Sequence, residues 1–136
     1  MQLFFVGTTR DASNILKNDS KEMKSNTAKF DSIMERGKKI TELMIAGKMA
    51  DVGSEMHEYW MEKRQRQRKH TDEKINLAYD DAVKNGAFGG KLVGAGGSGF
   101  ILLLSDDTEK TRDIMNKYEM PELKFKLSHN GYEVIT

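Results

Sequence analysis

A glycine-rich stretch between two apolar runs is the strongest constraint on how this 136-residue chain can fold. Residues 94–99 carry four glycines, residues 92–93 before them are Leu-Val, and residues 100–104 after them are Phe-Ile-Leu-Leu-Leu. Short apolar runs bounded by glycines predict two buried strands joined by a loop. Glycine lacks a Cβ and tolerates positive φ, so backbone N–H groups in such a loop can converge on an anion. The stretch predicts either a phosphate-facing loop or a hairpin that packs tightly on a helix and binds nothing.

Two nucleotide-binding motifs resemble this stretch but do not fit it. Gly94, Gly96 and Gly99 match the spacing G-x-G-x-x-G of dinucleotide-binding proteins. That motif needs a helix after the loop to receive the pyrophosphate, whereas an apolar run without a capping residue follows here. The protein-kinase phosphate loop is also strand–loop–strand, but the sequence has no H-R-D, D-F-G or V-A-I-K motif. The P-loop ending in Gly-Lys-Ser/Thr is absent as well.

Composition indicates one soluble domain without an electrostatic preference for nucleic acid. The formal net charge is +1 and 32% of residues are charged. The chain has no cysteine, which agrees with a reducing compartment, and no apolar run approaches the length of a membrane span. We therefore expect a cytoplasmic protein with neither a nucleic-acid nor a membrane partner.

Hydrophobic periodicity predicts an α+β domain. The expected order is strand, several helices, two strands, helix and two strands. A capping box at Asp19-Ser-Lys-Glu22 is expected to begin the first long helix, and Gly86 is expected to end a later one. Strands are expected at residues 3–6, 92–93, 100–104, 123–127 and 132–135, and helices at 8–18, 19–44, 52–63, 75–85 and 106–115.

The basic run at residues 63–70 has two interpretations. No aromatic residues interleave it and the rest of the chain balances its charge, which favours a solvated helix face over a nucleic-acid site. Its first residues follow Tyr59-Trp60, so part of the run could meet a phosphorylated ligand. The three histidines, His57, His70 and His129, are too scattered to predict a metal site.

Residues 91–99, Lys-Leu-Val-Gly-Ala-Gly-Gly-Ser-Gly, resemble the third motif of the GHMP small-molecule kinases, K-x-x-G-A-G-G-G-G. This family includes galactokinase, homoserine kinase and mevalonate kinase, and Ser98 replaces one glycine of its motif. Shorter matches at residues 3–13, 56–63 and 85–91 are similar to the heptose-phosphate (D-glycero-D-manno-heptose 7-phosphate) kinase branch. The resemblance extends from about Leu3 to Ile135.

The resemblance covers only the C-terminal half of such a kinase. Family members are well over twice this length, and their first half carries a G-L-G-S-S-S-like phosphate loop and the acid that orients the acceptor hydroxyl. No such loop occurs in this sequence. We therefore expect residues 1–136 to form a GHMP kinase C-terminal-like domain without the ATP-loop domain, as a fragment, a split-gene subunit or a relic. The implied fold is ferredoxin-like, a mostly antiparallel four-stranded sheet with helices on one face.

The resemblance also implies a phosphate- or substrate-binding role for particular residues. The loop of Gly94, Ala95, Gly96, Gly97, Ser98 and Gly99 would direct amides toward the transferred phosphoryl group or the sugar. Arg10 and Lys63 are the candidates for the sugar's own phosphate, Arg10 because a guanidinium can bind phosphate in bidentate fashion. Lys91 would either reach the same site or neutralise a carboxylate beside the loop. No catalytic residue is assigned.

The implied partners are a phosphorylated sugar and either a complementary N-terminal kinase domain or a second copy of the chain. ATP and Mg²⁺ are expected only in the assembled kinase, with none bound tightly to this chain and no activity from it alone. The alternative is a non-catalytic ferredoxin-like domain that binds a ligand or regulates another protein.

Overall fold

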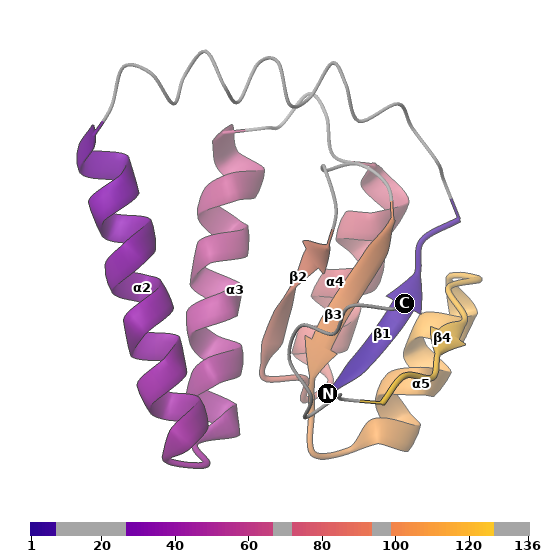
Figure 1. Cartoon of the computed structure of the whole chain (residues 1–136). Coiled ribbons are helices and arrows are strands. Elements are labelled where there is room, and N and C mark those ends of the chain that lie inside the picture. The colour runs from indigo at the N-terminus through magenta and orange to yellow at the C-terminus, as the bar shows by residue number, and fades with distance from the viewer. Residues whose placement is uncertain (8–26, 67–71, 94–98, 127–136) are drawn as a thin grey trace, which may run out of the picture.

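The computed structural model describes residues 1–7, 27–66, 72–93 and 99–126. Within these ranges the chain forms four strands and four helices (Figure 1). In chain order they are β1 (Gln2–Phe5), α2 (Thr27–Ile45), α3 (Met49–Arg66), α4 (Glu73–Lys84), β2 (Gly89–Val93), β3 (Phe100–Leu104), α5 (Thr108–Lys117) and β4 (Glu122–Leu123).

The four strands form one antiparallel sheet in the order β2-β3-β1-β4. This order, with a helix connection before β2 and another before β4, is that of a ferredoxin-like fold, and it confirms the predicted α+β class. Phe4 lies opposite Ile101, which in turn lies opposite Leu92. Because side chains alternate across a strand, these three residues share one face of the sheet.

The hydrophobic core lies between that face and helices α4 and α5, which lie behind the sheet in Figure 1. The core residues contributed by the sheet include Phe4, Leu92, Ile101 and Leu103, and those contributed by the helices include Ile75, Ala78, Tyr79, Ile114 and Met115. The opposite face is also apolar. It carries the half-buried Leu3, Phe5, Phe100 and Leu102.

Helix α3 lies beside β2, and α2 packs on the far side of α3 (Figure 1). Helix α3 approaches β2 very closely because both elements carry glycines where they meet. A Cβ on Gly53 of α3 would lie 2.5 Å from Phe88 Cβ, and one on Gly89 would lie 2.2 Å from the Gly53 carbonyl oxygen. A Cβ on Gly90 would lie 1.9 Å from the Leu102 carbonyl oxygen. These three positions therefore have no room for a side chain.

The predicted helices at 75–85 and 106–115 correspond to α4 and α5, with ends that differ by one or two residues. Asp72 caps α4 by accepting a hydrogen bond from the Lys74 N–H, and Asp107 caps α5 by accepting one from the Lys110 N–H. Gly86 follows α4 with φ +111°, as predicted for a residue that ends a helix.

The strand expected at residues 123–127 is wrong for most of its length. The structure has only the two-residue β4, and residues 124–126 belong to no strand. The register pairs Leu3 with Leu123, so Lys124 falls opposite Gln2, the first residue of β1, and residues 125 and 126 have no residue of β1 opposite them. The capping box at Asp19, the helix at 8–18 and the strand at 132–135 lie outside the described residues.

A candidate phosphate-facing site

The glycine stretch connects two antiparallel neighbours, β2 and β3, as the sequence predicted. Residues 94–98 lie outside the described part of the chain, but both ends of the connection are described. Gly99 has φ +107°, and a Cβ there would lie 2.7 Å from the Val93 carbonyl oxygen. The Gly99 carbonyl accepts a hydrogen bond from the Val6 N–H at 3.1 Å, which holds the end of β1 beside the connection. A strand rather than a helix follows, so the dinucleotide-binding interpretation is excluded.

Lys91 lies on the face of the sheet that α4 and α5 leave open, opposite Leu102. Its ammonium group is 5.9 Å from the centroid of the Tyr59 ring, and the Arg36 guanidinium is 5.7 Å from the same centroid. The negative face of an aromatic ring attracts cations, so Tyr59 holds a positive charge from α2 and another from β2. Among the described residues no carboxylate is recorded as pairing with Lys91. Arg36 differs, because it is paired with Glu62 at 2.8 Å.

Lys63 lies one helical turn after Tyr59, on the same side of α3. Gly53 lies against Gly89, and Tyr59 lies against Lys91, so α3 and β2 advance in the same direction. Lys63 therefore lies toward the end of β2 at which the glycine stretch begins. Of the predicted site residues that the structure describes, Lys91 thus lies in the middle of β2, Gly99 lies just before β3, and Lys63 lies one turn beyond Tyr59 on the neighbouring helix. Arg10, Gly94, Ala95, Gly96, Gly97 and Ser98 lie outside the described residues.

The basic run is partly used in structural contacts. Arg64 forms two hydrogen bonds with the Asp80 carboxylate, at 2.6 and 3.1 Å, which join α3 to α4. This pairing agrees with the interpretation of the run as an ordinary helix face. Residues 67–70 lie outside the described part.

Sequence reasoning missed a buried polar contact directly behind β2. The His57 Nδ1 atom is 2.9 Å from the Tyr79 hydroxyl, which is 3.2 Å from the Gly90 carbonyl oxygen. The two rings are stacked with centroids 5.8 Å apart. Burial raises the pKa of Tyr79 well above its usual value, so this hydroxyl keeps its proton. No sequence motif marks this contact, because its three residues belong to three separate elements.

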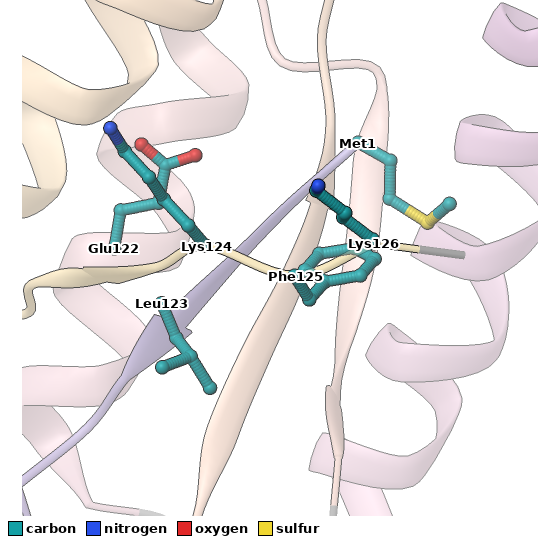
Figure 2. A pocket seen from close by; sticks show the side chains of 6 residues that line it. All are labelled: Met1, Glu122, Leu123, Lys124, Phe125 and Lys126. Carbon is teal, nitrogen blue, oxygen red and sulfur yellow. The ribbon is translucent and has the colours of Figure 1, made fainter. Parts of the chain in front are cut away.

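The structure also contains a cavity of about 590 Å³ at the opposite edge of the sheet. Its lining side chains come from Met1, from β4 and from the three residues after β4, including Lys124, Phe125 and Lys126 (Figure 2). None of the predicted site residues that the structure describes lines it. The described residues contain no cluster of three metal-ligating side chains, and none of their helices is long and apolar enough to cross a membrane.

The arrangement around β2 is suited to holding an anion. Lys91 of β2 presents a positive charge beside Tyr59, two residues before the strand ends at Val93, and Gly99 just before β3 has a positive φ of +107° that favours glycine. Such groups bind and orient a phosphate but do not by themselves activate a nucleophile.

Comparison with known families assigns the domain. The family described as GHMP kinases C terminal matches residues 40–119, which is more than half of the chain. The match includes α3, α4, the β2–β3 hairpin and α5. The chain therefore belongs to the GHMP kinase C-terminal domain family. A search of curated proteins found no match.

Proposed function

We propose that this chain is the substrate- and phosphate-side domain of an ATP-dependent sugar kinase of the heptose-phosphate branch. Family membership supports the kinase class. The choice of branch is supported by the sequence matches at residues 3–13, 56–63 and 85–91. The proposed substrate is a phosphorylated sugar, and the proposed partner is a complementary domain that carries the ATP phosphate loop.

The observation that carries the proposal is the position of Lys91, which lies against Tyr59 on β2, the strand that leads into the glycine stretch. Phosphoryl transfer depends mainly on positioning and on electrostatic stabilisation of the phosphoryl oxygens. In this proposal the amides of residues 94–99 face the transferred phosphoryl group, while Lys63 and Arg10 bind the phosphate that the sugar already carries. Lys91 adds positive charge beside the hairpin. MgATP is held mainly by the complementary domain, so the chain alone is inactive.

The second candidate is a non-catalytic ligand-binding or regulatory domain. A ferredoxin-like fold is compatible with it, because one fold hosts many unrelated functions. The two candidates differ in one respect that can be measured. Only the kinase candidate requires that activity appear when a complementary ATP-loop domain is added.

The test is a phosphotransfer assay with ATP and a panel of phosphosugars. We expect no turnover from the chain alone and ATP-dependent phosphorylation when a GHMP N-terminal domain of the heptose-phosphate branch is added. The proposal assigns the ATP phosphate loop to the complementary domain. It would be contradicted if the purified chain alone turned over ATP and if Gly96→Val abolished that turnover. Absence of activity in every mixture would favour the non-catalytic candidate.

The substitution Lys91→Met tests in the same assay whether Lys91 belongs to the site. Methionine keeps most of the aliphatic stem but removes the charge, so we expect a raised KM for the phosphosugar at nearly unchanged melting temperature. Lys84→Met is the matched control, because Lys84 is an exposed lysine in the last turn of α4. Equal effects of the two substitutions would exclude Lys91 from the site.

A further inference from the structure

Three elements meet at Gly90. His57 is on α3, Tyr79 is on α4, and the Gly90 carbonyl belongs to β2. Tyr79 is 1% exposed, and its ring also lies 6.1 Å from the buried Trp60 ring. The hydroxyl of Tyr79 therefore lies in the interior at the junction of both helices with the strand that leads to the glycine hairpin.

The chemistry of the acceptor fixes the direction of both hydrogen bonds. A carbonyl oxygen can only accept, so the Tyr79 hydroxyl proton is donated to Gly90. The hydroxyl has no second proton, so the contact at 2.9 Å is a hydrogen bond only if His57 Nδ1 carries a proton and donates it. In the neutral ring the lone pair then lies on Nε2.

We propose that His57 and Tyr79 are positioning residues that hold β2, and through it the glycine hairpin, in the orientation needed at the site. The role assigned to the hairpin rests on the proposed kinase function, whereas the hydrogen-bonded link does not. The link continues from the His57 imidazole through the Tyr79 hydroxyl to the Gly90 backbone. Neither residue touches the ligand in this proposal.

The packing around the link explains why a small displacement would reach the hairpin. A Cβ on Gly89 would lie 2.7 Å from His57 Cβ, and one on Gly90 would meet the backbone of Leu102 in β3. Strand β2 is thus confined between α3 and β3, and the link fixes it along the remaining direction, toward α4. Lys91 follows Gly90 directly, so the position of its ammonium group near Tyr59 depends on the position of β2 as well.

The first test uses hydrogen exchange and NMR on the chain alone. The imidazole ¹⁵N shifts of His57 should show the Nδ1–H tautomer at neutral pH. Tyr79→Phe should speed amide exchange in β2 and at Gly99 by about tenfold, the effect of losing one hydrogen bond of ordinary strength. Tyr118→Phe is the control, because its hydroxyl bonds to Asp81 at 3.2 Å and joins α5 to α4 without involving β2.

A conservative replacement separates positioning from simple packing. The side-chain amide nitrogen of asparagine can occupy the place of Nδ1, whereas glutamine places its nitrogen further out. His57→Asn should therefore keep the slow exchange of β2, and His57→Gln should lose it. A Nε2–H tautomer, or equal exchange rates in Tyr79→Phe and Tyr118→Phe, would overturn the proposal.

The kinase assay with the complementary domain then tests the consequence for the site. We expect Tyr79→Phe to lower kcat severalfold with a smaller change in KM, and Tyr118→Phe to change neither. If the wild-type mixture is inactive, the proposed function fails. The amide exchange rates then still show whether the hydrogen bonds from His57 through Tyr79 to Gly90 hold β2 in place. If the mixture is active and Tyr79→Phe leaves kcat unchanged, the positioning role is wrong even though the function stands.

Discussion

At the scale of single residues, the glycines of this chain divide by what surrounds them. Gly53, Gly89 and Gly90 have backbone or Cβ atoms within 2.5 Å of where a Cβ would lie, so their role is close packing of α3, β2 and β3. Gly37, in the middle of α2, has nothing within 4 Å. Gly89 and Gly90, which precede the glycine stretch of residues 94–99, are therefore required for packing, and the phosphate-facing role proposed for residues 94–99 does not extend to them.

We expect Gly90→Ala to lower the free energy of unfolding by about 3 kcal/mol, the upper range for overpacking, because the Leu102 backbone cannot move without disturbing β3. Gly37→Ala should raise it by roughly 0.5–1 kcal/mol, since alanine is the better helix former. Denaturant titration followed by the fluorescence of Trp60, the only tryptophan, measures both. If Gly90→Ala left the free energy of unfolding unchanged, β2 would be less tightly confined than described.

A second residue-scale prediction concerns acid stability and Glu122. Burial alone would raise the pKa of Glu122, but hydrogen bonds from Arg112 and Gln2 more than offset this and hold the pKa below its ordinary value of 4.5. A carboxyl group whose pKa is lower in the folded state stabilises the fold above its unfolded pKa and loses that contribution as pH falls.

Glu122→Gln should therefore reduce stability at neutral pH and flatten the loss of stability between about pH 5 and the lowered pKa. Thermal melts across pH 3–7 on both proteins measure the difference. Glu109→Gln, an exposed acid in the first turn of α5, is the control. Parallel curves for wild type and Glu122→Gln would show that the contacts with Arg112 and Gln2 contribute nothing.

At the scale of elements, most of what the sequence predicted came from local chemistry. The helix end at Gly86 and the apolar runs of β1 and β3 depend on neighbours in sequence, and the structure confirms them. The length of β4 was predicted wrongly because residues 125 and 126 have no residue of β1 opposite them, and the sequence of a strand does not record where its partner begins.

The candidate site shows the same division between local and long-range information. The glycine hairpin could be predicted from its own residues. The contacts of Lys91 with Tyr59, and of Tyr79 with His57 and Gly90, join residues between 11 and 32 positions apart and needed the packed fold.

The cap of α5 supplies the element-scale prediction. Asp107 accepts from the Lys110 N–H at 3.0 Å, so Asp107→Ala should cost about 1 kcal/mol of unfolding free energy. Asp113→Ala removes an exposed acid from the same helix and should not destabilise the domain. Urea titration of the two variants is the measurement. Equal losses would mean that the change of charge, and not the cap, is responsible.

At the scale of the whole molecule, the described residues leave apolar surface exposed on the open face of the sheet and on α2, among other places. The open face of the sheet carries Leu3 and Phe5 beside Val93 and Leu123, which are 38% and 48% exposed. Helix α2 carries Met34 and Met44, which are 60% and 49% exposed. Apolar surface of this kind marks an interaction site or an association hazard.

We expect the isolated chain to self-associate through the open face of the sheet and to bind a hydrophobic dye. Adding the complementary domain should reduce both effects, because it would cover the same surface. Sedimentation velocity at several concentrations, with and without that domain, is the measurement. A strict monomer that binds no dye would contradict the expectation.

The most direct test of the central claim, that the glycine hairpin is a phosphate-facing part of a kinase site, is Gly97→Val. A β-branched residue disfavours positive φ and blocks close approach of a ligand to the backbone. Melting temperature and phosphotransfer with the complementary domain are measured on the same protein. The account predicts an unchanged melting curve with activity lost. A large drop in melting temperature, or full activity at an unchanged one, would contradict it.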